Sequence, residues 1–600
     1  MIKHAMVIIT IAMLLLSGFM INPVIGESEI TISNIGNTSS VDNEGDGNYT
    51  KIQNAIDNSS DGDTILVYSG IFHENIIVDK ELFIIGIDHE LDIGNDKGKP
   101  LIYGDNKDAT IEVKADNCTI KGLNIKNGNI GIKIFIFSNN VIANNNITNN
   151  GLGILLAADS INNNISNNYI ANNKGGLVKK GGIILNYVSD NIVYKNIFLN
   201  NAMNRGVFVD HGYRNQIIDN IFLENDIICV FSGFDHKIIN NSINSNIEVL
   251  SNNITLQNNK IKHGVYLRFK VQNEHIITNN SAQGKPICFY KDQKDIFVPD
   301  DVAQVIMLNC SNCSISNIKI TNIIEAVNIK NSKNILISKN DISYCYNNGI
   351  FIENSNQVNI SKNKISYCYN PYYDLGYGIN IVHSNNNEIS NNNISNIRNN
   401  GIHLSNSGNN TIFNNRIWQN EGGIFLAASD TNSIYDNTIL ENFGYGIQLW
   451  TYSTKNNIFQ NNIKDNKNGI IFTGVNNNNI NNNIVETNSY SGILISSWDM
   501  PPSKSYNNII TKNIILENWI GVYIIDDENS IIRWNIIESN NNFGLLTVDS
   551  IVNARFNWWG SILGPSRTKL SLLGDRIDFQ NGRIKVFPWL PFRNLFITRI

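Results

Sequence analysis

The sequence predicts an all-β fold, a right-handed parallel β-helix solenoid with coils of about 22 to 24 residues. The reason is that two short sequence motifs, which we call words, recur along it. The first word, Asn-x-Ile, returns at steps of 21 to 24 residues, with a few longer steps of 28 to 31. The second word, Gly-Ile-x-Leu or Gly-Ile-x-Ile, keeps pace with the first. In the second half of the chain the first word begins at Asn340, Asn363, Asn392, Asn415, Asn437, Asn461, Asn482, Asn513 and Asn535.

Each word describes a short strand, because apolar and variable residues alternate in it. Ile suits the inward positions, since β-branched side chains stack well on a pleated face. Asn suits the turns, because it tolerates a left-handed backbone and its amide can pair with the same residue in the coils above and below. Asn-rich stretches such as residues 391–418 are therefore predicted to be folded coils and not a disordered tract.

The elements are expected in a simple order along the chain. Residues 1–26 form a signal peptide, and residues 27–262 form an N-terminal cap with the first β-helix block; within this cap Ile52, Ala55 and Ile56 have the spacing of a short capping helix. Both words vanish over residues 263–304, which we interpret as an insertion in one continuous solenoid, the alternative being a break between two solenoids. Residues 305–557 form a second block, and residues 558–600, with their Trp and Pro residues, form a C-terminal cap or closing strands.

Composition and the N-terminus restrict location and partners. The apolar run near the N-terminus indicates a secretory signal peptide or an uncleaved anchor, so we expect a monomer that is secreted or on the extracellular cell surface, with no other membrane contact. A net charge of −6 without a basic stripe gives no reason to expect nucleic acid. Seven Cys are too few for a disulfide scaffold. Cys345 and Cys368 lie 23 residues apart, so they are expected to be stacked neighbours that form either a disulfide or a buried ladder.

Three segments resemble one known family. Residues 47–86, 280–317 and 553–590 are similar to the N-terminal, middle and C-terminal patterns of NosD-type β-helix proteins of archaea and bacteria. The resemblance implies the pectin-lyase-like superfamily and its carbohydrate-binding and sugar-hydrolase repeats, which occur in lyases, hydrolases, epimerases and non-enzymatic surface proteins. The NosD name also implies copper-site maturation. Because the 9 His and 7 Met are scattered, we regard this role as the least favoured and expect no cofactor or metal site.

Acid–base chemistry on a β-helix requires reactive side chains at the same position in adjacent coils. The outward positions of the Gly-Ile-x-Leu strand form two such columns, and neither contains a stack of acids. Ordinary solvated surface is the alternative interpretation for each polar group found there or nearby. The candidate catalytic residues are Glu353, Asp374, His383, His403, Asp210 and His211.

Enlarged turns carry aromatic residues that could stack on sugar rings, with polar neighbours that could bind hydroxyls. A row of such turns would make a groove for a polysaccharide or surface glycan; the alternative is that the rings pack over exposed solenoid. The candidate binding residues are Tyr372, Tyr373, Tyr377, Trp450, Tyr452, Trp498 and Asp499.

These features favour a polysaccharide-binding β-helix protein without catalysis. A polysaccharide-active lyase, hydrolase or epimerase working near Tyr372, Asp374, His383 and His403 is the second hypothesis. A purely structural surface or adhesion protein is the third. An acidic pair in one groove would favour the enzyme, whereas a long aromatic strip without acids would favour binding.

Overall fold

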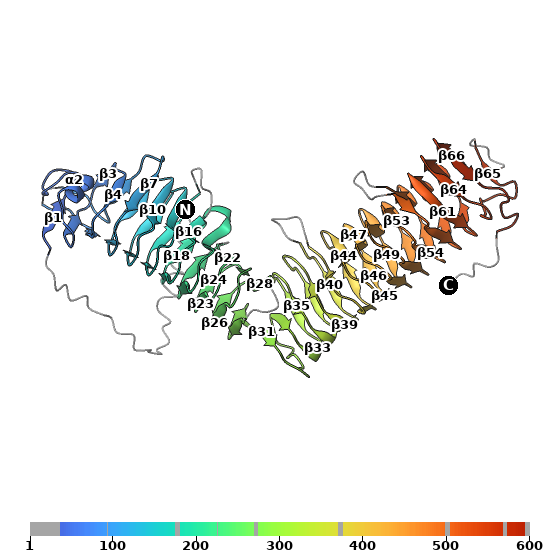
Figure 1. The fold of residues 1–600 in the computed structure, drawn as a ribbon, viewed down its shortest axis with the longest axis horizontal. Helices are drawn as coiled ribbons and strands as arrows, with labels where there is room; N and C mark the ends of the chain where they lie inside the picture. Colours follow the sequence, from blue (N-terminus) through green and yellow to red (C-terminus); the bar gives the residue numbers. More distant parts are fainter. Residues whose placement is uncertain are drawn as a thin grey trace.

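A computed structural model describes residues 36–92, 94–174, 181–224, 226–268, 274–369, 376–497, 504–567 and 573–593. The chain forms a right-handed parallel β-helix whose two arms meet at an elbow (Figure 1). Helix α2 (Ile52–Asp57) contacts the strands at the start of the first arm and buries Ile52, Ala55 and Ile56, which confirms the predicted capping helix. The predicted signal peptide lies outside the described residues.

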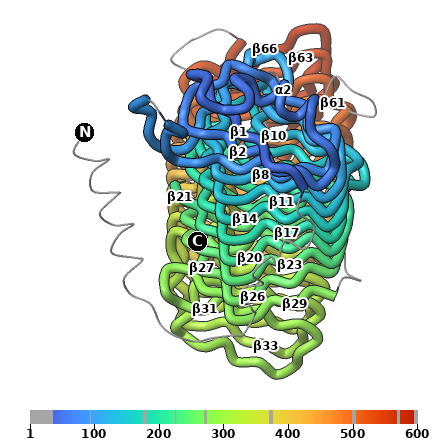
Figure 2. Tube along the Cα trace, turned by 90° about the vertical axis from the view of Figure 1, so that its left-hand side faces the viewer, coloured from blue at the N-terminus to red at the C-terminus, as the bar shows by residue number. Residues whose placement is uncertain are grey.

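Most coils have three short strands, so each arm has three sheets. In the first arm, eleven first strands run from β1 (Thr38–Val41) to β29 (Ile276–Thr278), and nine third strands run from β4 (Ile76–Val78) to β28 (Val265–Leu267). The second strands run from β3 (Ile71–Phe72) to β30 (Ser281–Ala282). Figure 2 shows first strands such as β14, β17 and β20 one above another; these three are Asn164–Ser166, Ile192–Tyr194 and Gln216–Ile218.

The second arm repeats this arrangement. Its first strands form a 13-stranded sheet from β33 (Ser311–Ser316) to β67 (Arg583–Lys585), and ten second strands run from β34 (Lys319–Thr321) to β62 (Ile536–Glu538). Its third strands run from β31 (Lys285–Lys291) to β66 (Gly574–Gln580). The second strands used below are β37 (Asp341–Ser343), β40 (Lys364–Ser366), β43 (Asn393–Ser395), β46 (Arg416–Trp418) and β49 (Thr438–Leu440). The third strands used below are β35 (Val327–Lys330), β38 (Ile350–Glu353), β41 (Ile379–Val382), β44 (Asn400–Ser405), β47 (Gly422–Ala427) and β50 (Tyr445–Trp450).

At the elbow the two arms meet in different ways on different sides of the solenoid. After β30 the chain reverses at Gln283 and Gly284, which both have positive φ as a two-residue hairpin requires, and β31 pairs antiparallel to β30. On another side of the solenoid the two arms touch directly, since the Ile324 amide donates to the His263 carbonyl at 2.7 Å. The hairpin therefore acts as a wedge, and Figure 1 places β31 and β33 on the outside of the bend.

Buried asparagine ladders join the coils. In the turn between first and second strands, each Asn Nδ2 and backbone N donate to the Oδ1 of the Asn in the next coil, at 2.8–3.1 Å from Asn145 to Asn280 and again from Asn340 to Asn557. This confirms the predicted pairing of amides between coils. One position was wrong by a residue: Asn483 and not Asn482 enters the ladder, because Val485 and not Ile484 points inward.

Closing strands end the second arm. β66 pairs with β63 (Phe543–Val548), β67 pairs with β64 (Ile551–Asn553), and Trp559 is completely buried. The division of the chain into blocks at residues 262 and 305 stays a prediction. Across the described ranges, no helix has the length and apolar character needed to span a membrane.

Candidate functional site

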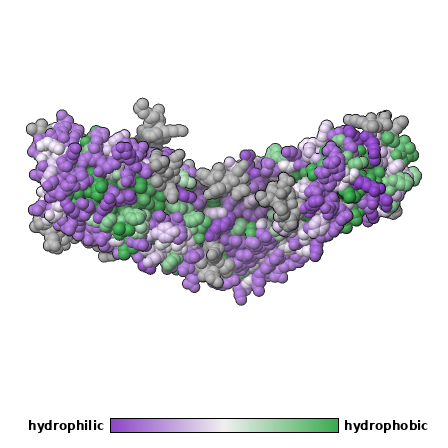
Figure 3. Space-filling model, turned by 45° about the horizontal axis from the view of Figure 1, so that its top comes forward, coloured by the Kyte–Doolittle hydropathy of each residue, from purple (hydrophilic) through white to green (hydrophobic). Residues whose placement is uncertain are grey.

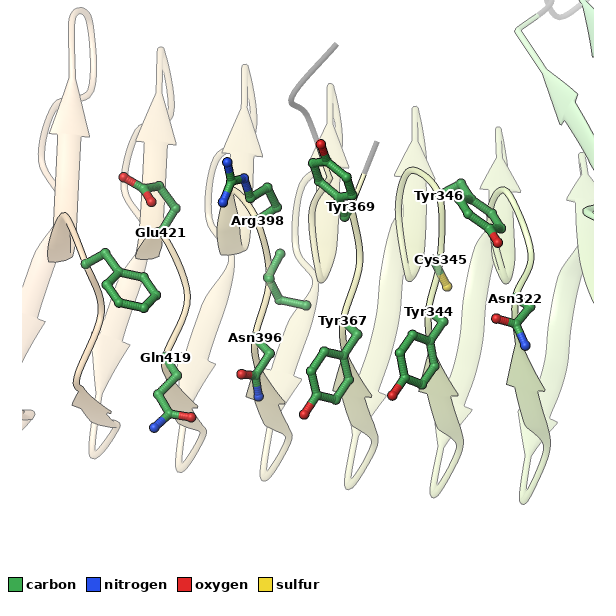
Figure 4. Close-up of a pocket in the computed structure, with 12 residues that line it drawn as sticks. Asn322, Tyr344, Cys345, Tyr346, Tyr367, Tyr369, Asn396, Arg398, Gln419 and Glu421 are labelled. Atoms are coloured by element: carbon green, nitrogen blue, oxygen red, sulfur yellow. The ribbon is translucent and has the colours of Figure 1, made fainter. Parts of the chain in front are cut away.

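A groove of about 750 Å³ lies on the second arm, over the turns that join second strands to third strands. We call it the tyrosine groove. Two rows of side chains face each other across it, and each row follows the solenoid axis from coil to coil (Figure 4). Asn322 lies at the elbow end and Phe443 at the far end. The first row is Tyr344, Tyr367, Asn396 and Gln419; the second row is Tyr346, Tyr369, Arg398 and Glu421.

The first row owes its position to the backbone of the turn. Each of its members comes directly after a second strand and has a φ of 54–57°, in the left-handed region. This conformation is uncommon for a large residue such as Tyr344 or Tyr367, and here the stacked coils impose it at every turn. Two residues further on, the chain has turned toward the third strand, and the side chains of the second row emerge opposite the first.

The floor between the rows is apolar. Cys345 and Ile397 line it, and they belong to the column Ile323, Cys345, Cys368 and Ile397, whose members are each at most 2% exposed. From the next coil onward the same position is Asn420, Asn442, Asn466, Asn488, Asn518 and Asn540, which form another amide ladder. Four of the six turns along the groove therefore have Ile or Cys in place of this ladder, whereas the two turns at the far end, with Glu421 and Phe443, carry Asn420 and Asn442. Both Cys345 and Cys368 are free thiols, and hydrogen bonding to Cys368 together with burial raises the pKa of Cys345 well above its ordinary value.

The walls combine exposed rings with polar groups. The rings of Tyr344 and Tyr367 stack in parallel at 4.9 Å and are about half exposed. On the other wall the Arg398 guanidinium lies 5.6 Å from the ring of Tyr369, which is 42% exposed. At the far end Gln419 donates to the Glu441 carboxylate at 2.9 Å. Aromatic surface beside amide, guanidinium and carboxylate groups suits a ligand that has both apolar faces and many hydroxyls.

A second aromatic surface, which we call the aromatic strip, lies on the outer face of the third strands. The Tyr377 ring stacks on His403 at 4.6 Å, His403 stacks on Phe425 at 5.5 Å, and Phe425 lies 5.9 Å from Trp450. The strip crosses four consecutive coils, because β41, β44, β47 and β50 pair in register. It thus joins Tyr377, His403 and Trp450, three residues that the sequence singled out.

His403 is held as a neutral imidazole. Burial lowers its pKa to about 4. Its Nδ1 lies 2.8 Å from Oδ1 of Asn380, an acceptor, so Nδ1 carries the proton and Nε2 keeps a lone pair. The chain of contacts continues inward: Asn380 donates to Asn348 at 3.4 Å, and Asn348 donates to the Glu325 carboxylate at 2.5 Å. A neutral imidazole with a fixed tautomer is able to accept a proton.

Buried charges gather between the aromatic strip and the elbow. Glu325 is fully buried and pairs with Arg268 of the first arm at 3.0 Å. Lys330, 3% exposed, pairs with Glu353 at 2.7 Å. Burial lowers the pKa of Lys330 although Glu353 opposes this shift. Since each cation has a carboxylate partner, this cluster connects the arms without adding net charge.

The remaining candidates lie apart from one another. Glu353 and His403 do not meet, because the coil of β41 lies between them and sets them about 10 Å apart. His383 is exposed in a turn. Tyr452 is 60% exposed in the turn after β50. Asp210 pairs with His211 at 2.8 Å in the first arm, far along the chain from the groove. The predicted residues Tyr372, Tyr373, Asp374, Trp498 and Asp499 lie outside the described residues.

The tyrosine groove was missed as a unit by sequence reasoning. Its signal was the word Ile-Ser-Tyr-Cys-Tyr-Asn, which occurs at residues 342–347 and again at residues 365–370. We interpreted that repeat through its cysteines, although the tyrosines on either side line the groove. Arg398 and Glu421 carried no comparable signal. Among the described residues, no group of three or more His, Cys, Asp or Glu side chains could hold a metal ion.

Comparison with known proteins supports the fold across most of the chain. The family model described as "Right handed beta helix region" matches residues 109–250, 303–463 and 452–557. A cell surface glycoprotein of Methanothermus fervidus is 32% identical over 143 residues, which cover 23% of this chain. The matched part spans only 21% of the length of that glycoprotein.

Solved structures share the architecture at low identity. The tailspike protein of Escherichia coli bacteriophage HK620 matches with a TM-score of 0.36 and 10% identity, covering 64% of this chain and 68% of the tailspike. The periplasmic alginate epimerase AlgG matches with a TM-score of 0.32 and 11% identity, covering 66% of this chain and 76% of the epimerase. An alginate lyase of Paenibacillus matches with a TM-score of 0.30 and 15% identity, covering 38% of this chain and 96% of the lyase. Scores this low carry no argument about function.

Proposed function

Because this chain belongs to the right-handed β-helix family, which leaves the activity open, we propose from its own surface that it binds a polysaccharide, without catalysis, in the tyrosine groove. The observation that carries the proposal is the groove itself: two walls of exposed tyrosines over an apolar floor, with Arg398 and Glu421 on one wall. Pyranose rings present apolar C–H faces to aromatic side chains and hydroxyls to charged and amide groups.

The direction of the groove supports a linear polymer as its ligand. Its rows follow the solenoid axis over six turns, from Asn322 to Phe443, and neighbouring coils are about 4.8 Å apart. A chain of sugars lying along the axis would meet an equivalent pair of wall positions at each coil. The aromatic strip, with Tyr377 and Trp450, offers such a chain a second contact surface on the same arm.

We place this binding function outside the cell, secreted or at the cell surface. The relative in Methanothermus fervidus is named a cell surface glycoprotein, and the N-terminal sequence has the pattern of a secretory signal. A glycan of a cell envelope or of the surroundings is then the ligand class that the protein would meet.

Binding is tested with the purified mature chain and a panel of acidic and neutral polysaccharides. The expected result is pull-down of at least one polymer by the wild type and its loss in the double variant Tyr367→Ala, Tyr369→Ala. New reducing ends and unsaturated products are assayed in the same tubes. If no polymer is retained by the wild type, the proposal fails and a structural or adhesive role takes its place.

A second candidate function, a polysaccharide-active enzyme, is favoured by one observation. His403 has a free Nε2 lone pair, sits among stacked rings and is neutral at neutral pH. It can therefore accept a proton from a bound sugar, although its lowered pKa makes it a weaker base than an ordinary histidine. If the wild type forms products and His403→Ala does not, the enzyme becomes the better proposal. Binding in the tyrosine groove would then serve catalysis.

A further inference from the structure

The two ends of the tyrosine groove differ. At the elbow end the Tyr346 ring meets the His263 ring edge to face, with centroids 4.5 Å apart. His263 belongs to the first arm, and its Nδ1 lies 3.0 Å from the Asn322 carbonyl. The first arm thus places an aromatic side chain beside the last turn of the groove.

Backbone and amide contacts hold this ring pair in place. The Ile324 amide donates to the His263 carbonyl at 2.7 Å, which brings the turn of His263 against the turn of Asn322. The side chain of Gln283 donates from Nε2 to the carbonyls of Thr321 at 3.0 Å and Asn322 at 2.9 Å. The elbow end is therefore built from hydrogen-bonded backbone of both arms and not from one movable side chain.

The far end has a different character. Phe443 is its last lining residue, and its ring is 69% exposed. The Phe443 amide continues the stacking of turns by donating to the Asn420 carbonyl at 2.9 Å. An exposed ring at this position offers a stacking surface to a chain that leaves the groove, whereas the rings at the elbow end are already packed against each other.

From this asymmetry we propose that the tyrosine groove recognises a free end of a glycan chain, with the terminal sugar against Tyr346 and His263 and the rest of the chain leaving past Phe443. The inference rests on the proposed function. It specifies the ligand as a chain terminus, and not an internal segment. Because one sugar unit in an extended chain is similar in length to one coil step, the groove accommodates about five units.

Stoichiometry separates end binding from internal binding, whatever the sugar. Two size fractions of each polymer in the panel, one about ten times longer than the other, are titrated with protein by calorimetry. End recognition gives the same number of proteins per chain for both fractions. A number of bound proteins that rises with chain length overturns the inference but leaves the proposed function standing. No binding by any polymer overturns both.

Oligosaccharide ladders of two to eight units, made from cellulose, xylan, mannan and polygalacturonate, provide an independent check. Affinity is expected to rise with length up to about five units and then level off. The variant Tyr346→Ala is expected to weaken binding at least tenfold, and His263→Ala supplies a second test from the other arm. Tyr490→Ala is the matched control, since that ring also makes an edge contact, with Tyr523 at 6.4 Å, elsewhere on the second arm. Unchanged affinity in both groove variants contradicts the inference.

Discussion

The same turn of the coil is built in two ways within the second arm. From Asn420 to Asn540 the second position after each second strand carries a ladder of amides, each bonded to the next coil. From Ile323 to Ile397 it carries Ile and Cys, and the tyrosine groove lies above it. Amides that bond only to their neighbours secure the stack, whereas apolar side chains leave a floor on which a ligand can bind. An apolar residue in this column adds a floor to the groove, whereas the turns of Asn420 and Asn442 join the ladder and still supply the last wall residues of the groove.

The largest expected effect comes from interrupting the ladder. Asn442→Leu removes the acceptor of the Asn420 amide groups and one donor to Asn466. Each buried polar group left without a partner costs about 1–3 kcal/mol, so the local unfolding free energy should fall by about 3 kcal/mol. Hydrogen exchange of residues 415–470 measures this loss. Gln448→Leu, on the outer face of the same arm, is the control and should change the exchange little.

A histidine interrupts another ladder in the first arm and should make stability depend on pH. His236 accepts from the Asn215 amide through Nδ1 at 3.3 Å, where the coils before it use Asn, and burial lowers its pKa to about 4. Since the folded pKa lies below the ordinary 6.5, this contribution to stability is present at pH 7 and is lost as the pH falls from 6.5 toward 4.

Between pH 7 and pH 5 this single group should lower the unfolding free energy by about 2 kcal/mol. His236→Asn restores the amide ladder, and its stability should fall less over the same interval. Denaturant unfolding at the two pH values measures the difference. Equal pH slopes for wild type and variant would show that His236 is not held neutral.

Removing one tyrosine from the groove should affect binding and leave the fold intact. Tyr367→Ala deletes a half-exposed ring that stacks on Tyr344, so polysaccharide affinity should fall about tenfold, or 1.4 kcal/mol. Tyr435→Ala is the control, because Tyr435 stacks on Phe413 and Phe459 in another sheet. Equal losses in both variants would argue against the groove as the site.

The smallest effect is expected from extending the ladder into the groove. The Ile397 amide already donates to Asn420 Oδ1 at 2.9 Å, so the side chain of Ile397→Asn can join the column. New hydrogen bonds should offset the lost apolar burial and keep the stability change within about 1 kcal/mol. Affinity should fall about threefold, because the floor becomes more polar. Thermal unfolding and binding assays measure the two effects, and stronger binding would contradict the role given to the floor.

Much of the fold was predictable because it repeats. Asn-x-Ile fixed the period, and the Gly-Ile-x-Leu word gave the two outward columns, whose pairing of Phe351 with Asn380 and His403 is confirmed. The groove was not predictable as a unit, since its walls come from residues of six turns. Only two of these turns share a local pattern, the repeated Ile-Ser-Tyr-Cys-Tyr-Asn. Nor could the sequence anticipate that His263 of one arm would meet Tyr346 of the other, because that contact depends on how the hairpin at Gln283 redirects the chain.

Surface character varies along the rod. In the view of Figure 3 hydrophobic residues gather on the first arm and near the far end of the second, with mainly hydrophilic surface between them. Phe135, Ile136, Tyr187 and Phe231 of the first arm are each about half exposed or more. Phe135 ends the third strand β10 (Ile130–Phe135), and the other three residues follow directly after third strands, at positions that the two repeated words do not include.

The wedge at the elbow has a mechanical consequence. A pull on the two ends of the rod runs across the strands, so it loads each coil interface in series. Ordinary interfaces share the load among three in-register ladders, but at the elbow, in the described segments, strand pairing between the arms is limited to β30 and β31. The backbone hydrogen bond from Ile324 to His263, and side chains such as Gln304, which bonds to both backbone groups of Val265, carry the remainder. Under tension the rod should yield first at this joint, while the arms on either side stay wound.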